Sequence, residues 1–207
     1  KHVSHNMKKL KSFWKKPTET FELVLSKDIN WIRTLLLFGC NGIVFIYYIM
    51  KSEGYINIES LQMTIVSILA MVSLGIIYGI ISNLIIGFLI KLTGKLFNAE
   101  NDLKKIYSVL SWSYFPLLIS VLFLIPSILI ARIITTDINT TLKLTLSILI
   151  IILMLVQAVF GIWQLILLFK GLKIAQKLNS INTILNYLSG ALIFGIFYYF
   201  LVRPYLY

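Results

Sequence analysis

Five long apolar runs, separated by short polar segments, dominate the chain. They are Ile32–Met50, Leu61–Leu92, Tyr107–Ala131, Leu144–Phe169 and Thr183–Val202. A helix that crosses the roughly 30 Å hydrocarbon core of a bilayer needs about 20 apolar residues, and each run is about that long or longer. The strands of a membrane β-barrel would alternate apolar and polar residues over segments of about ten. The pattern therefore predicts an all-α integral membrane protein, a bundle of five transmembrane helices.

The most polar interruption in the middle of this pattern is Lys91–Pro116, which we call the elbow. It follows the longest apolar run, which as a single helix would measure about 48 Å. Within the elbow, Asn98–Asp102 is prone to turns, and Leu103–Phe115 is expected to form a short separate helix at the membrane interface. Two prolines, Pro116 and Pro126, predict kinks in the third span, because each removes a backbone hydrogen bond.

A second helix is expected before the first apolar run. Pro17 suits the first turn of a helix, and Phe21 begins an apolar face that continues at helical spacing. Trp14 and Trp31 lie on either side of this segment, where tryptophans of a membrane-interface belt are common. The segment predicts an amphipathic helix lying in the interface, and a solvated leader is the alternative.

The composition agrees with a membrane protein, and the distribution of charge predicts which segments face the cytoplasm. The chain is 58% hydrophobic, above the usual 45–50% or so of soluble domains. Its net charge of +11 comes mostly from Lys and Arg in three segments: the N-terminal leader, the elbow and the loop after the fourth run. The positive-inside rule places these segments in the cytoplasm, so the N-terminus is cytoplasmic and the C-terminus, after five spans, is outside.

Two parts follow from this reading of the chain. Residues 1–30 form a cytoplasmic basic leader with the amphipathic helix, and residues 31–207 form a single five-span membrane domain. We expect a multi-pass protein of the cell membrane, in contact with anionic lipids and not with nucleic acid, because the position of the positive charge is explained by topology.

Small and polar residues recur on one face of two runs. In the second run they come every four residues, at Gly75, Gly79, Asn83 and Gly87. Small residues let helices approach closely, so this stripe predicts either packing inside the bundle or a face for dimerisation or a partner. In the fourth run the residues are Gln157, Gly161 and Gln164. They indicate either hydrogen bonds between helices or an uncharged polar track.

Lysines are concentrated at the elbow and after the fourth run. They are Lys95, Lys104, Lys105, Lys170, Lys173 and Lys177. Near a membrane surface each is worth about 1 kcal/mol against anionic lipid. This set predicts a cytoplasmic surface that docks a partner or binds lipid headgroups.

Residues that could carry catalysis are scarce in the apolar runs. All eight acidic residues lie outside the runs, and the single cysteine, Cys40, can form no intramolecular disulfide. The sequence contains no Walker A loop, HExxH or GxSxG motif. Catalysis needs an acid, base, nucleophile or metal, and ion-coupled transporters usually carry ionisable groups inside the membrane. We therefore expect no enzymatic activity, no cofactor and no metal.

Three stretches, in this order and spacing, resemble a known family. They are Pro17–Phe21 before the first run, Ser111–Pro116 in the elbow, and, at the end of the fourth run, Trp163 with Leu165 and Leu167, followed by Gly171–Lys173 and Ala175–Leu178. The chain resembles a bacterial member of the Yip family, the membrane proteins named for interacting with Ypt/Rab GTPases in eukaryotes. Family members often have a Gly-Gly pair in the elbow, where this chain has Asn98-Ala99.

The resemblance implies five spans, a cytoplasmic N-terminus, and a role in membrane organisation, trafficking or the assembly of other membrane complexes. Some bacterial members accompany ABC-type exporters, and no catalytic residue comes with the family. We expect a non-enzymatic protein whose partner is a membrane complex, such as an ABC exporter subunit, or a second copy of itself. Two alternatives stay open: a transport or channel component using Gln157, Gln164, Asn83 and Asn186, and a scramblase-like or curvature-sensing lipid-handling protein.

Overall fold

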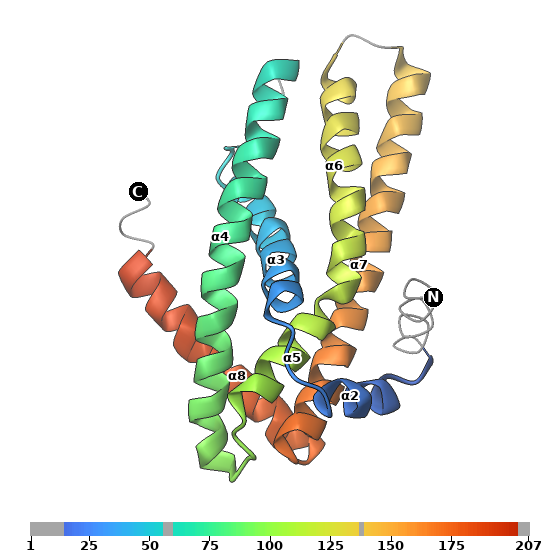
Figure 1. Ribbon diagram of the computed structural model, residues 1–207. Coiled ribbons are helices and arrows are strands. Elements are labelled where there is room, and N and C mark those ends of the chain that lie inside the picture. Colours follow the sequence, from blue (N-terminus) through green and yellow to red (C-terminus); the bar gives the residue numbers. More distant parts are fainter. Residues whose placement is uncertain (1–14, 56–59, 137–138, 203–207) are drawn as a thin grey trace. The chain divides into compact units, whose positions relative to one another are not determined.

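The computed structural model describes residues 15–55, 60–136 and 139–202. Within these ranges every regular element is a helix (Figure 1). The helices are α2 Pro17–Leu25, α3 Trp31–Ser52, α4 Leu61–Gly94, η1 Lys95–Phe97, α5 Leu103–Ser113, α6 Phe115–Thr135, α7 Thr140–Gln176, α8 Ser180–Phe197 and η2 Tyr198–Val202. By length and composition, five helical segments of the described chain can cross a membrane. The all-α, five-span prediction is confirmed, and the orientation of the termini stays a prediction.

Helix α2 begins at Pro17 as expected, yet its apolar face meets protein. Phe21 is fully buried, and its ring lies against Gly171 of α7. Leu23, on another face, is 62% exposed. The amphipathic helix therefore forms, but Phe21 is inserted into the protein and not into the headgroup layer. Trp14 lies outside the described residues.

The third apolar run is two helices and not one kinked span. Helix α5 ends at Ser113, α6 begins at Phe115, and Pro116 falls in the first turn of α6. A proline is well tolerated there, because the N–H that it lacks would have no partner inside the helix. Where a kink was expected at Pro116, the helix is interrupted at Tyr114, just before the proline. Pro126 lies inside α6, and the kink expected at that position stays a prediction.

The short separate helix expected before Pro116 is α5, but its environment differs from the expectation. Every residue from Ile106 to Ser113 is buried. Tyr107 OH donates a hydrogen bond to the carbonyl of Leu84 at 2.9 Å, which ties α5 to α4. Helix α5 is therefore packed within protein on nearly all sides.

Contacts within the chain define two compact units. Unit 1 comprises Lys1–Thr34, Asn83–Ser113 and Leu165–Tyr207, and unit 2 comprises Leu35–Ser82 and Tyr114–Gln164. Helices α3, α4 and α7 contribute to both units, and the break between α5 and α6 falls at the boundary. The sequence-based division at residue 30 stays a prediction.

Glycines bring α3 and α4 together in unit 2. A Cβ on Gly42 would overlap the backbone of Gly75 and Gly79, and a Cβ on Gly79 would overlap the carbonyl oxygen of Phe38. The two backbones are therefore in direct contact, which only residues without a side chain permit.

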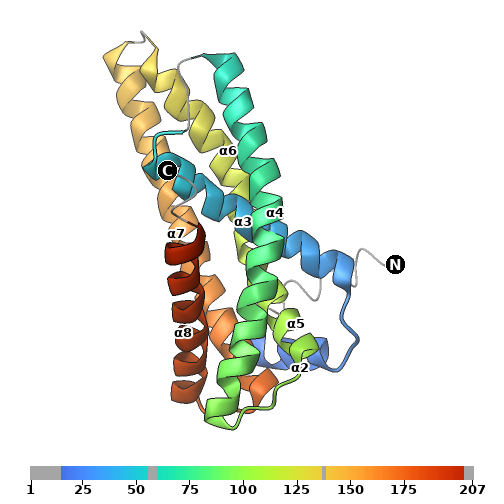
Figure 2. The same ribbon diagram turned by 90° about the vertical axis from the view of Figure 1, so that its left-hand side faces the viewer.

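Apolar side chains complete unit 2. Ile43 of α3, Met71 of α4, and Leu124 and Ile128 of α6 form a buried cluster. Helices α6 and α7 lie side by side in both views (Figures 1 and 2), and the rings of Phe123 and Phe160 stack with centroids 6.4 Å apart. Most of α7 in this unit is exposed, as a helix facing lipid would be.

Unit 1 gathers the end of α4, α5, the end of α7, α8 and α2. A Cβ on Gly190 of α8 would approach the backbone nitrogen of Ile90 to 3.2 Å, so α8 lies close against α4. Val109 of α5 and Phe21 of α2 both contact Gly171 of α7. This packing places the part of the elbow between α4 and α5 next to the turn between α7 and α8.

Candidate functional site

The glycine stripe of α4 packs inside the protein. Gly75 and Gly79 lie against α3 in unit 2, and Gly87 lies against Tyr107 in unit 1. Asn83 is fully buried. Of the two interpretations of the stripe, the structure favours internal packing, and it leaves none of the four residues exposed as a face for a partner.

The elbow turns through a left-handed residue. After η1, Asn98 adopts φ 54°, and the N–H of Ala99 donates to the carbonyl of Gly94 at 3.0 Å. Asparagine tolerates the left-handed conformation better than most residues, because its short side chain can bond locally. Asn98 therefore takes a conformation that glycine favours, which explains how the turn forms here without a Gly-Gly pair. Asp102 then caps α5, accepting from the N–H of Lys104 at 2.9 Å.

Two contacts of Glu100 join the elbow to the end of α7, and a third ties Glu100 to Lys105 within the elbow. The N–H of Glu100 donates to the carbonyl of Gln176 at 2.9 Å. The Glu100 carboxylate binds Lys105 Nζ through Oε1 and Lys177 Nζ through Oε2, each at 3.1 Å. We call Glu100, Lys105, Gln176 and Lys177 the elbow cluster. Because it joins segments more than seventy residues apart, it holds the elbow in one position on unit 1.

Behind this cluster lies a buried set of polar side chains, Thr93, Gln176 and Asn186, which we call the polar core. Thr93 Oγ1 donates to Asn186 Oδ1 at 2.6 Å, and Asn186 Nδ2 donates to Gln176 Oε1 at 2.9 Å and to the Ile90 carbonyl at 3.2 Å. All three residues are at most 5% exposed. Gln176 belongs to both groups, so the polar core supports the elbow cluster directly.

The electrostatics of Glu100 give a pH prediction. Hydrogen bonds from Lys177 and Lys105 lower the pKa of the Glu100 carboxyl below its ordinary value of 4.5. Because the pKa is lower in the folded chain, the stabilisation from Glu100 is fully present above about pH 4.5 and is lost as the pH falls through the lowered pKa. We expect Glu100→Gln to flatten the loss of thermal stability in that acid window, measured by melting the purified chain at successive pH values.

The control for this measurement is Glu22→Gln, which changes an exposed acid of α2 that forms no ion pair among the described residues. It is expected to leave the acid profile as it is in the wild type. An equal flattening by both substitutions would contradict the role of Glu100, because the profile would then reflect the overall charge.

The six lysines predicted as a docking surface all lie in unit 1. Lys105 and Lys177 are engaged by Glu100, and Lys173 Nζ lies 3.1 Å from Ser180 Oγ. Lys95, Lys104 and Lys170 are exposed, as is Leu96 beside them in η1, at 78%. We call Lys95, Leu96, Lys104, Lys170 and Lys173 the elbow surface.

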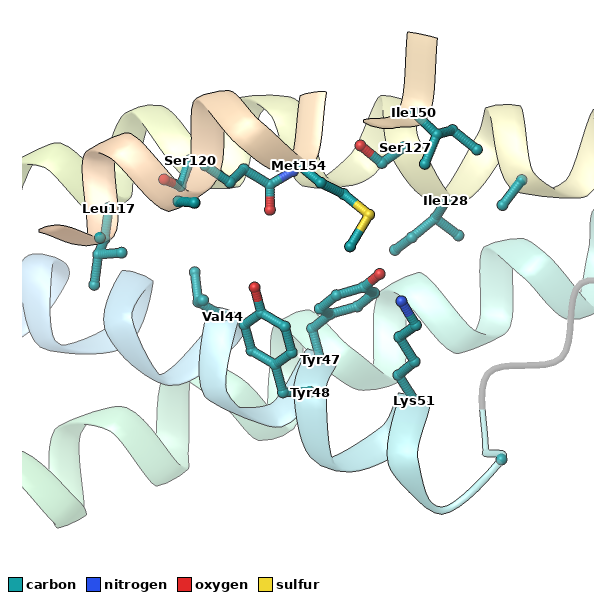
Figure 3. Close-up of a pocket in the computed structure, with 15 residues that line it drawn as sticks. Val44, Tyr47, Tyr48, Lys51, Leu117, Ser120, Ser127, Ile128, Ile150 and Met154 are labelled. Atoms are coloured by element: carbon teal, nitrogen blue, oxygen red, sulfur yellow. The ribbon is translucent and has the colours of Figure 1, made fainter. Parts of the chain in front are cut away.

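Part of the predicted polar track lines a cavity in unit 2. The cavity has a volume of about 530 Å³, and Gln157 and Gly161 are among the residues that line it, whereas Gln164 is not. Figure 3 shows Tyr47, Tyr48 and Lys51 of α3 facing Ser120 and Ser127 of α6 and Met154 of α7 across it. Sequence patterns did not single out Lys51 or Ser127. A signal was present, because Ser120 and Ser127 are two turns apart and share a helix face.

The amides proposed for an uncharged pathway are divided between the two units. Gln157 and Gln164 belong to unit 2, whereas Asn83 and Asn186 are fully buried in unit 1. Asn186 is bound within the polar core. Asn186 is therefore engaged in the packing of unit 1, and an uncharged pathway stays a hypothesis.

Comparison with known families comes down to one match. A family model described as the Yip1 domain matches residues 11–202. The chain belongs to the Yip1 domain family. The family resemblance drawn from the three stretches is thereby confirmed, and a bacterial origin stays a prediction. No match was found among curated proteins or among solved structures.

Both candidate sites described above belong to the part of the chain that the Yip1 domain model matches. The elbow surface and the cavity lie between residues 11 and 202. Among the residues that the structure describes, no three His, Cys, Asp or Glu side chains come together as a metal site would require. The two candidate sites in this Yip1 domain are an exposed basic surface, the elbow surface, and an amphipathic cavity in unit 2.

Proposed function

We propose that this Yip1-domain protein is a non-enzymatic, multi-pass protein of the cell membrane that docks a partner membrane complex on its elbow surface. The observation that carries the proposal is the way the elbow surface is held. Its lysines come from two segments, the elbow and the end of α7, which Glu100 and Gln176 join.

A surface held in this way suits binding. The lysines are attached to a buried frame, the polar core, so little backbone order has to be gained when a partner docks. The exposed Leu96 adds an apolar contact among positive charges. Positive potential of this kind speeds encounter with an acidic partner surface and sets its register.

The positive charge of the elbow surface predicts that it faces the cytoplasm. It carries the basic loops that the positive-inside rule assigns to the cytoplasm. The partner class that fits is a membrane complex with an acidic cytoplasmic segment, and the family resemblance makes an ABC-type exporter subunit the first to test. A second copy of this chain is the competing partner.

Charge reversal tests the docking. We expect the triple variant Lys95→Glu, Lys104→Glu, Lys170→Glu to lower recovery of the partner from native membranes by about tenfold or more, because each reversal places like charges against the acidic surface. The measurement is quantitative mass spectrometry of proteins that co-purify with the tagged full chain. All three lysines are exposed and lie outside the elbow cluster, so the fold should be unaffected.

The matched control is Lys143→Glu, which reverses an exposed lysine near the other end of α7. Its recovery of the partner should equal that of the wild type. The proposal would be overturned if the triple variant retained the partner, or if the wild-type chain came from native membranes with no stoichiometric partner.

A further inference from the structure

The shape of the cavity in unit 2 suits part of a lipid. Its volume of about 530 Å³ lies in the range of about 300–1,000 Å³ that is usual for small-ligand sites. The lining residues of α6 run from Leu117 to Ala131, a distance of about 20 Å along the helix. One leaflet of the hydrocarbon core is about 15 Å deep. The cavity is therefore long enough to take a lipid from its headgroup well into the bilayer.

A cation lies at one end of this cavity. Lys51 is the penultimate residue of α3. It takes no part in the ion pairs found among the described residues. Its Nζ is 5.8 Å from the centroid of the Tyr47 ring. Figure 3 shows the Lys51 ammonium and the hydroxyls of Tyr47 and Tyr48 directed into the cavity. Lysine and tyrosine at the end of a span lie at headgroup depth, where an anionic group would meet all three.

Two further polar groups lie deeper. The hydroxyl of Ser120 is buried and has no hydrogen-bond partner within the described chain, and the residue is 3% exposed. In hydrocarbon an unsatisfied polar group costs several kcal/mol. Gln157 also lines the cavity, three residues or about 4.5 Å along α7 from Met154. Met154 faces Tyr47 and Lys51 in Figure 3, so Gln157 lies about one helical turn from the level of the cation.

Ser127 and Ile128 line the cavity near Lys51, and the wall toward the other end is apolar, with Val44 and Leu117. From the Lys51 end inward the cavity therefore offers a cation with two phenols, then an amide and an unpaired hydroxyl, with Val44 and Leu117 as the apolar wall beside and beyond them. A phospholipid presents the complementary order: a phosphate, then ester groups, then acyl chain.

We propose that this cavity binds one anionic phospholipid. The phosphate lies against Lys51 and the phenols, the glycerol and its esters against Gln157 and Ser120, and one acyl chain along the apolar wall. This inference is independent of the docking proposal, because it concerns unit 2 alone.

The test is native mass spectrometry of the purified full chain with equal amounts of phosphatidylglycerol and phosphatidylcholine. The wild type is expected to retain one phosphatidylglycerol per chain, in about fivefold preference, as one lysine near an anionic headgroup would provide. Lys51→Gln is expected to abolish the preference. Ser120→Ala with Gln157→Leu is expected to lower retention of both lipids alike, because esters are common to both.

The control is Lys143→Gln, which removes an exposed lysine of α7 that does not line the cavity. It should keep the preference. A second measurement uses only the wild type: a phosphatidylglycerol with a photoreactive acyl chain should label the peptides that carry Val44, Leu117 or Met154.

Four results would overturn the proposal. They are equal retention of the two lipids by the wild type, equal loss of preference in Lys51→Gln and Lys143→Gln, labelling confined to peptides outside the cavity, and displacement of the lipid by inorganic phosphate alone. Lys51→Gln should leave partner recovery in the docking assay unchanged, so failure of one proposal is distinguishable from failure of the other.

Discussion

Gly79→Ala is expected to destabilise unit 2 more than any other single methyl addition on the α4 stripe. The added Cβ would fall on the carbonyl oxygen of Phe38 and the backbone of Gly42. A side chain could move aside, but backbone atoms of a packed helix can do so only by separating α3 from α4. Overpacking of this kind costs about 1–3 kcal/mol, and we expect the upper end of that range because the clash is with backbone.

The measurement is the melting temperature of the detergent-purified chain, followed by size-exclusion chromatography after heating. A loss of about 3 kcal/mol corresponds to a fall of about 6–12 °C for a chain of this size. Gly161→Ala is the matched control, because a Cβ on Gly161 would meet nothing within 4 Å. It should stay within about 0.5 kcal/mol of the wild type.

The same pair of variants also separates the two interpretations of the stripe. If Gly79→Ala kept its melting temperature and instead changed the oligomeric state of the chain, the stripe would be a face between copies and not an internal contact. Equal losses in Gly79→Ala and Gly161→Ala would likewise contradict the close approach of α3 and α4.

Asn186→Leu is expected to cause the second large loss of stability, in unit 1. The substitution removes the acceptor of Thr93 Oγ1 and the donor to Gln176 Oε1 and to the Ile90 carbonyl. A buried group left without its partner costs about 1–3 kcal/mol, although bonds between membrane helices average nearer 0.6 kcal/mol. We therefore expect a total loss of about 2–4 kcal/mol.

The loss of these hydrogen bonds in Asn186→Leu should also destabilise the elbow. Gln176 also accepts the N–H of Glu100 through its backbone carbonyl, so a Gln176 side chain that has lost its donor loosens the position of the elbow. Amide hydrogen exchange over residues 95–105 should rise in Asn186→Leu, because local opening there becomes easier. Exchange over α3 in unit 2 should not change.

Asn182→Ala is the control, one helical turn earlier on α8 and outside the polar core. It should leave both the melting temperature and the exchange of the elbow near their wild-type values. If Asn186→Leu melted like the wild type, or if the two substitutions raised exchange equally, the polar core would not be what supports the elbow.

Helix existence was the most predictable feature of this chain, for a simple reason. A span must satisfy its backbone hydrogen bonds internally, so long apolar runs such as Leu61–Leu92 have one solution. The start of α2 at Pro17 and the cap of α5 by Asp102 are also local, and both appear in the structure. The sequence alone does not decide whether Pro116 kinks a helix or begins one, because a proline disrupts a helix interior and suits a first turn.

The candidate sites were predictable only in part. The six lysines predicted as one surface come from two basic segments that contact each other in unit 1, and their role as a docking surface stays a prediction. That Glu100 binds Lys177 and the backbone of Gln176 could not be predicted, since Glu100 lies on a segment far from those two residues in sequence. Thr93 was missed for the same reason: its partner Asn186 comes from another helix.

By itself the sequence determined the number of spans, the positions of the polar turns and the place of the elbow in the chain. These depend on local backbone chemistry and on the cost of exposing polar groups to lipid. Only the tertiary structure decided which neighbour covers the glycine stripe, that Phe21 inserts into protein, and that Lys51 and Ser120 line one cavity. Lipid is as apolar as the helices themselves, so the hydrophobic pattern that selects a span does not select its partner; close packing and buried hydrogen bonds do.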